Sequence, residues 1–155
     1  MERHTCRVVI IRVLYSLDLN KQTDFTDEDL DYQIGYAIDP INDVELPLNL
    51  DNYELTKNNL SFIKESIKNI ILNIEEIDTI IEKNLQKYTI SRFNYVDRAI
   101  IRLATYELKN KLAPSQVVIN EAIELTKEYS NLDDDLQVKF NNKVLDNISK
   151  GLSNE

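Results

Sequence analysis

Hydrophobic residues recur every three or four positions along most of the chain, which is the spacing of amphipathic α-helices. The first such segment covers residues 3–19 and has two apolar stripes. One stripe consists of Cys6, Val9, Ile10, Val13 and Leu17, and the other of Val8, Ile11 and Tyr15. A helix with two apolar sides is either enclosed by the fold or presents one side to a partner. Both interpretations stay open, including a homodimer through the second stripe.

The same spacing predicts further helices at about residues 60–74, 74–85, 94–109, 114–129 and 135–150. The pattern is weakest over residues 22–50, where only a short helix near 27–36 is expected. Asn73 is expected to cap one of these helices, Pro114 to open another, and Gly151 to stop the last. Only two glycines and three prolines are present, too few for a fold rich in hairpins or for a glycine-rich nucleotide loop. Six or seven helices and no strand predict an all-α bundle.

The net charge of −9 belongs to one segment of the chain. Residues 22–56 hold ten of the 27 acids and no Lys or Arg, which leaves 17 acids against 18 bases elsewhere. Such a segment is typical of a solvated connection between helices, and it could also mimic nucleic acid or cover a basic site. Net acidity therefore does not exclude a nucleic-acid partner for the remainder.

Few residues could support catalysis or hold a metal. The chain has one cysteine and one histidine, and it lacks the HExxH, P-loop and GxGxxG patterns. His4 and Cys6 are two positions apart, roughly 200° around a helix, and so face away from each other. Asp133, Asp134 and Asp135 are expected to be helix caps. We expect no catalytic site, no metal and no cofactor, and a cytoplasmic protein without a membrane span.

Arginines gather at the start of the first predicted helix. Arg3 and Arg7 share a face, His4 lies beside them, and Arg12 lies further around the axis. Cations at a helix N-terminus oppose the helix dipole, so something must offset them. Nearby acids such as Asp18 could neutralise these arginines, and the phosphates of RNA could also neutralise them.

The C-terminal half contains three ordered blocks, VDRAIIRLATYEL (96–108), VVINEAIELTKEY (117–129) and KFNNKVLDNI (139–148). In this order they resemble the core of the bacterial NusB family. The similarity extends back to Tyr88 and Arg92, where the family tends to have Trp and Arg. In the first helix, Arg3, Arg7, Leu14 and Tyr15 also fit the family pattern.

The resemblance implies a NusB-like fold of two small helical sub-bundles, here residues 1–74, with the acidic connection at 22–56, and residues 75–155. It implies transcription antitermination through boxA-like RNA, bound together with the ribosomal small-subunit protein NusE in the transcription elongation complex, in support of ribosomal RNA synthesis. The implied RNA-binding residues are Arg3, His4, Arg7, Arg12, Tyr15, Phe140, Asn142 and Lys143. Tyr15 and Phe140 could instead be ordinary core.

Two positions depart from the family's usual FVNGVLD pattern. Lys143 stands where the family has Gly, and Asn141 stands where it has Val. Asn141 falls between Val138 and Leu145 on the predicted core stripe, so it must find hydrogen-bond partners or lose ~1 to 3 kcal/mol.

Two other functions remain compatible with the sequence. One is a NusB-like domain related to ribosomal RNA cytosine methyltransferases, which carry a similar helical domain ahead of a catalytic one. The other is a helical protein-binding adaptor that has lost RNA binding, which the net acidity and the changes at Asn141 and Lys143 would fit.

Overall fold

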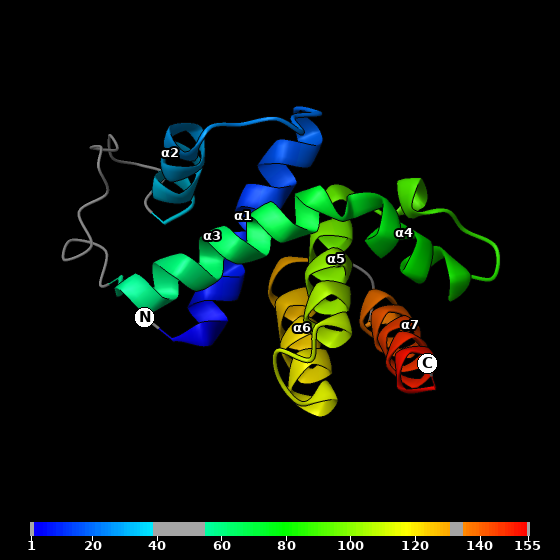
Figure 1. The fold of residues 1–155 in the computed structure, drawn as a ribbon. Helices are drawn as coiled ribbons and strands as arrows, with labels where there is room; N and C mark the ends of the chain where they lie inside the picture. The colour runs from blue at the N-terminus through cyan, green and yellow to red at the C-terminus, as the bar shows by residue number, and fades with distance from the viewer. Residues whose placement is uncertain (1, 39–54, 131–134, 155) are drawn as a thin grey trace. The chain divides into compact units, whose positions relative to one another are not determined.

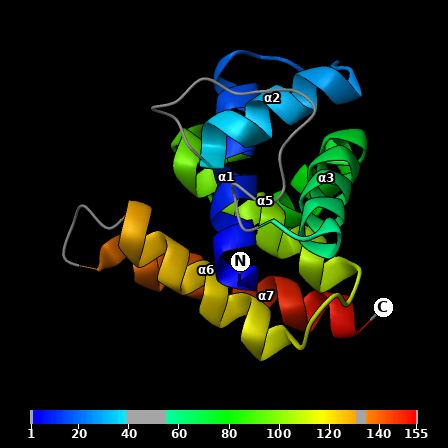
Figure 2. The same ribbon diagram turned by 90° about the vertical axis from the view of Figure 1, so that its left-hand side faces the viewer.

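The computed structural model describes residues 2–38, 55–130 and 135–154, in which it contains seven α-helices, one 3-10 turn and no strand (Figure 1, Figure 2). The prediction of an all-α fold is thereby confirmed. The chain divides into two compact units, Met1–Ile71 and Leu72–Glu155. The acidic connection at 22–56 lies partly outside the described residues, and its described part includes the helix Asp27–Ile38.

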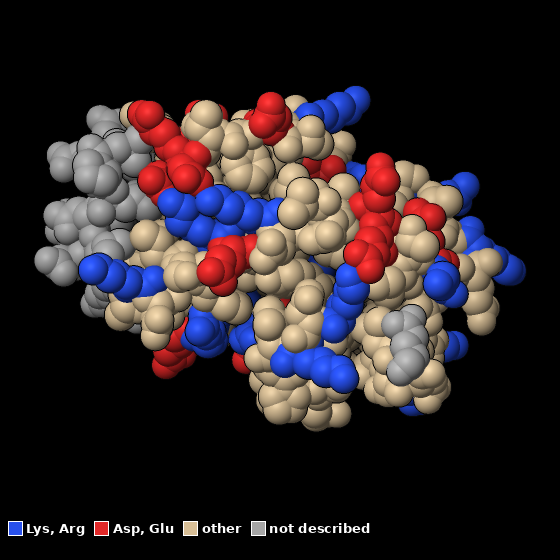
Figure 3. Space-filling model, in the orientation of Figure 1, with Lys and Arg blue, Asp and Glu red and all other residues tan. Residues whose placement is uncertain are grey.

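The first unit is built from three helices, α1 (Arg3–Leu19), α2 (Asp27–Ile38) and α3 (Lys57–Leu72). A reciprocal capping box starts α2: the Asp29 N–H donates to Thr26 Oγ1 at 3.1 Å, and the Thr26 N–H donates to Asp29 Oδ2 at 3.0 Å. The ion pairs Lys64–Asp31 (2.9 Å) and Lys68–Asp27 join α3 to α2, where acidic and basic side chains lie side by side (Figure 3).

Both apolar stripes of α1 are largely buried. Val8 and Ile11 of the second stripe are closed to solvent, as is the whole first stripe, whereas Tyr15 keeps 38% of its surface exposed. Enclosure of the helix is therefore the correct interpretation for Val8 and Ile11. A homodimer through this stripe has little exposed apolar surface on α1 to use.

The second unit is built around α5. It contains α4 (Ile74–Lys83), the 3-10 turn η1 (Ile90–Arg92), α5 (Tyr95–Lys109), α6 (Ser115–Tyr129) and α7 (Leu136–Ser153). Helix α5 packs against α4, α6 and α7, so its sides are mostly buried. The Arg102 guanidinium binds the Asp78 carboxylate through two hydrogen bonds of 2.9 Å, which tie α5 to α4.

Three residues that were predicted to begin or end helices do not act as expected. Asn73 and Asp135 occupy N-cap positions, but neither side chain accepts a capping hydrogen bond, and Asp135 adopts the left-handed conformation with φ 67°. Gly151 does not stop α7, which continues to Ser153. A glycine inside a helix costs only about 1 kcal/mol relative to alanine, too little to end a helix that neighbouring side chains hold in place. Asp133 and Asp134 lie outside the described residues.

Candidate nucleic-acid interface

Arg3 presents a guanidinium at the start of α1. Its Cζ lies 3.9 Å from the centre of the Phe62 ring on α3, in the same unit, and the residue is exposed. A guanidinium stacked on an aromatic face keeps its outer N–H groups available in a fixed plane. Arg3 is thus held in place by α3 while it remains open to an anion.

Two of the other cationic candidates on α1 are less accessible, whereas Arg12 is exposed. The Arg7 side chain is only 6% exposed, and His4 is half-buried. Arg12 donates from Nη1 to the backbone carbonyl of Ala37 at 2.8 Å, near the end of α2, where carbonyl groups lack helical partners. This hydrogen bond connects α1 to the end of α2 within the first unit. Phosphate contacts by these three residues stay predictions.

Cys6 is buried in α1, and burial raises the pKa of its thiol. The nearby Arg3 and Arg7 act in the opposite direction but do not outweigh the loss of hydration. A reactive cysteine needs a lowered pKa, because the thiolate is the nucleophile. The raised pKa of the Cys6 thiol is therefore the opposite of what a nucleophilic cysteine requires.

Phe140 lies in an aromatic cluster at the N-terminal end of α7. Its ring meets the rings of Phe93 and Tyr88 edge to face, with centroid distances of 5.7 Å and 6.2 Å. The Arg92 guanidinium lies 5.9 Å from the centre of the Tyr88 ring, and both residues are exposed, Tyr88 to 48%. We call Tyr88, Arg92, Phe93 and Phe140 the aromatic cluster.

The aromatic cluster borders a pocket of about 490 Å³ in the second unit. Polar side chains complete its lining, namely Asn94, Asp97 and Gln137. Asn142 and Lys143, one turn further along α7, are exposed. The structure thus brings Phe140 together with aromatic, cationic and amide groups from residues 88–94, around η1 and just before α5, and leaves Asn142 and Lys143 open to solvent.

A buried hydrogen-bond network lies beneath this pocket. Asn141 is 0% exposed, and its Nδ2 donates to Asp97 Oδ1 and to Thr126 Oγ1, each at 3.1 Å. Its Oδ1 accepts from Gln137 Nε2 at 2.8 Å, and Ser130 Oγ donates to Asp97 Oδ2 at 2.7 Å. The departure from the family valine is therefore fully accommodated, since Asn141 links α5, α6 and α7.

Asp97 also serves the start of α5. Its backbone N–H donates to Asn94 Oδ1 at 2.8 Å, so Asn94 caps α5 with its side chain. The cap fixes Asn94 at the pocket, and the Asn141 amide fixes Asp97. The pocket wall is therefore rigidly supported from below.

Our sequence analysis named Phe140 but missed most of its surroundings. Phe93, Asn94 and Gln137 had no assigned role, and Tyr88 and Arg92 entered only as positions that resemble the family. A usable signal was present for Tyr88 and Arg92: an aromatic and an arginine four apart in a polar stretch between two helices. Nothing local connects that stretch with Phe140, almost fifty residues later.

Two general findings concern the described residues alone. They contain no group of three or more His, Cys, Asp or Glu placed to hold a metal ion. Among their helices, none has both the length and the apolar character needed to cross a membrane.

Sequence comparison relates the chain to transcription antitermination proteins. A profile of the NusB family matches residues 4–150. The transcription antitermination protein NusB of Staphylococcus aureus strain MRSA252 is 36% identical over 150 residues, which are 97% of this chain and 100% of the relative. The Fusobacterium nucleatum protein of the same name is 44% identical over 96 residues, which are 62% of this chain and 61% of the relative.

Solved structures show the same relationship. NusB from T. maritima superposes with a TM-score of 0.75 at 29% identity, covering 97% of this chain and 92% of the other. A chain from the crystal structure of the antitermination factors NusB and NusE in complex with dsRNA gives a TM-score of 0.69 at 30% identity, covering 96% of each. The family profile spans nearly the whole chain, and relatives agree with it in sequence and in fold. The chain belongs to the NusB family.

Proposed function

We propose that this chain is a transcription antitermination factor that binds boxA-like RNA together with NusE and so supports transcription of ribosomal RNA by the elongation complex. The observation that carries the proposal is the surface on which the exposed Tyr88 and Arg92 lie beside the half-buried Phe140. The S. aureus relative bears the name of an antitermination protein, and the similar solved chain comes from a complex of NusB and NusE with dsRNA.

Unpaired bases are the natural ligand for the aromatic cluster. Proteins that bind single-stranded RNA stack bases on aromatic rings, and each such contact contributes ~1 to 3 kcal/mol. Tyr88 offers an exposed ring with Arg92 beside it to neutralise the attached phosphate. Asn142 would donate a hydrogen bond and Lys143 a charge from α7, while Arg3 would contact phosphate from α1.

The share of the S. aureus relative that the chain covers favours this function over a domain of a methyltransferase. The S. aureus protein is matched over 100% of its length, so a relative made of the NusB-like part alone carries the antitermination name. A protein-binding adaptor that has lost RNA binding is the remaining alternative. Sequence-dependent binding of RNA would reject it.

RNA titration with matched tyrosine variants tests the proposal. Fluorescently labelled boxA RNA is titrated with the wild-type chain and with Tyr88→Ala, each with NusE present and absent. We expect Tyr88→Ala to weaken binding by about tenfold, because one stacking contact is lost. Tyr36→Ala on α2 removes an equally exposed ring from the first unit and should leave binding unchanged.

Scrambled RNA provides the specificity control in the same titration. Equal affinity of the wild type and Tyr88→Ala would remove the aromatic cluster from the RNA site. Equal affinity for boxA and scrambled RNA, with and without NusE, would contradict the proposed function as a whole.

A further inference from the structure

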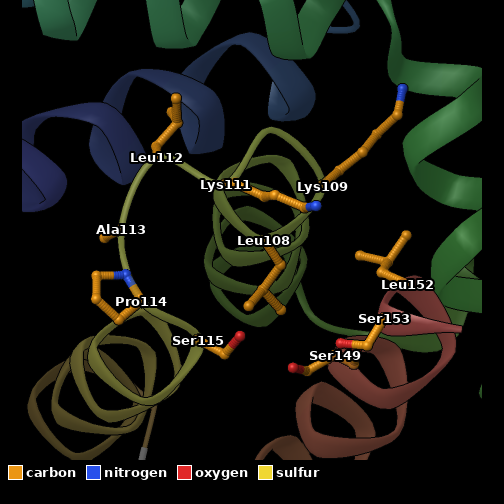
Figure 4. Close-up of a pocket in the computed structure, with 10 residues that line it drawn as sticks. All are labelled: Leu108, Lys109, Lys111, Leu112, Ala113, Pro114, Ser115, Ser149, Leu152 and Ser153. Atoms are coloured by element: carbon orange, nitrogen blue, oxygen red, sulfur yellow. The ribbon is translucent and has the colours of Figure 1, made fainter.

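A second cavity lies at the other end of α5, between the end of that helix, the start of α6 and the last turns of α7 (Figure 4). Its volume is about 860 Å³, enough for a molecule the size of a nucleotide. Helix α5 has 15 residues, so roughly 20 Å of helix separates this cavity from the aromatic cluster. The cavity is a separate feature of the second unit.

Lys111 supplies the charge in this cavity. Figure 4 shows its side chain running across the end of α5 on one side of Leu108, whereas Lys109 extends away from the other lining residues. Lys109 is engaged elsewhere, in an ion pair with Glu76 of α4. Within the described part of the chain, Lys111 has no ion-pair partner. The Lys111 ammonium group is thus an exposed cation at the edge of the cavity, with no ion-pair partner among the residues that the structure describes.

Hydroxyl groups from two other helices line the same cavity as Lys111. Ser115 of α6 and Ser149 of α7 point toward each other across the cavity, and Ser153 lies beside them (Figure 4). The Ser153 hydroxyl donates to the backbone carbonyl of Ser149 at 3.0 Å. The hydroxyls of Ser115 and Ser149 have no hydrogen-bond partner among the described residues. Both are available as donors to a ligand.

Among the residues that the structure describes, no Asp or Glu lines the cavity, although the chain carries nine more acids than bases. Leu108, Leu112, Pro114 and Leu152 supply its apolar lining. A lysine and hydroxyl donors select an anion with several oxygen acceptors. We propose that this cavity binds a phosphate group, carried either by a free mononucleotide or by an RNA strand. The site is independent of RNA binding at the aromatic cluster.

The backbone at Lys111 offers a variant that keeps the fold. Lys111 follows α5 in the left-handed conformation, with φ 52°, a position that glycine normally takes. Lys21 follows α1 with the same φ of 52°, and both helices end in an Asn–Lys pair. Lys111→Gly removes the cation and relieves the backbone, and Lys21→Gly makes the same change far from the cavity in sequence and in the other unit.

Phosphate titration compares these two variants. Inorganic phosphate is added to the full-length ¹⁵N-labelled protein at constant ionic strength, and amide shifts of residues 108–115 and 149–153 are followed. We expect saturable shifts in the wild type and in Lys21→Gly. In Lys111→Gly the dissociation constant should rise by about tenfold, the effect of losing one charged hydrogen bond. Ser149→Ala should weaken binding by a smaller factor.

Three results of this titration would contradict phosphate binding at Lys111. An absence of saturable shifts in the wild type, or equal binding by wild type and Lys111→Gly, would overturn the proposal. Equal losses in Lys21→Gly and Lys111→Gly would do so as well, since only overall charge would then matter.

Two further titrations identify the source of the phosphate. Binding of AMP more tightly than inorganic phosphate, and lost in Lys111→Gly, would support a free mononucleotide. Weaker RNA binding in Lys111→Gly, with Tyr88→Ala fully additive to it, would support a second contact along an RNA strand. Failure of the proposed function would abolish the effect of Tyr88→Ala but leave phosphate binding at Lys111 intact.

Discussion

Asn141 departs from the family pattern, yet its buried side chain forms hydrogen bonds that connect three helices of the second unit. It replaces an apolar residue on the inner face of α7, where an isolated amide would be costly. The structure surrounds it with Asp97, Thr126 and Gln137, which satisfy both ends of the amide. The need for partners could be predicted from the position alone. Their identity could not, because Asp97 and Thr126 lie 44 and 15 residues away in the chain.

Restoring the family residue at this position should therefore destabilise the protein. Asn141→Val deprives the buried Asp97 carboxylate and the Gln137 amide of a partner, and we expect the free energy of unfolding to fall by ~1 to 3 kcal/mol. Urea denaturation followed by circular dichroism measures the change. The neighbouring Asn142→Val, on the exposed side of α7, is the control and should change stability by less than about 0.5 kcal/mol. An Asn141→Val protein as stable as the wild type would show that the network contributes nothing net.

At the scale of helices, the apolar periodicity located six of the seven α-helices of the described chain, because burial of an apolar stripe dominates helix stability in a folded protein. The seventh, α2, was expected only as a short helix in a segment with a weak pattern. Helix ends were less predictable. Caps contribute only about 1 kcal/mol each, so tertiary packing can override them, as it does at Gly151. The aromatic cluster could not be predicted from the sequence for a different reason. Phe93 and Phe140 come into contact only after α5 and α7 have packed together.

Gly151 provides the test at this scale. It lies within α7, its φ is not positive, and a Cβ atom added there would meet no atom within 4 Å. Gly151→Ala should raise the free energy of unfolding by about 0.5 kcal/mol, somewhat less than in a helix centre because the last turn frays. Thermal unfolding and helical circular dichroism would report the gain. A lower stability of Gly151→Ala would mean that the last turn of α7 must bend or open.

At the scale of the whole molecule, charge is distributed in a way that limits RNA affinity. Residues 22–56 contribute −10 and the remainder of the chain +1, so the whole of the net charge of −9 comes from that segment. Among the proposed contacts, Arg3, Arg12, Arg92 and Lys143 are exposed, although Arg12 also donates to Ala37, whereas Arg7 is buried. If RNA binding rests on these cations, as we propose, the chain alone binds weakly and NusE must contribute further contacts.

The salt dependence of RNA binding measures how many phosphates the chain contacts. Each neutralised phosphate of a single strand contributes a slope of about −0.7 to log K against log salt, so three contacts predict roughly −2 for the chain alone. Arg3→Ala should reduce the magnitude of the slope by about 0.7, as should Arg92→Ala, because each removes one contact. Lys57→Ala, an exposed cation at the start of α3, should leave it unchanged. With NusE present the slope should steepen, since the partner adds contacts of its own. A slope near zero, or one that none of these substitutions alters, would show that RNA is held without the cations assigned to it.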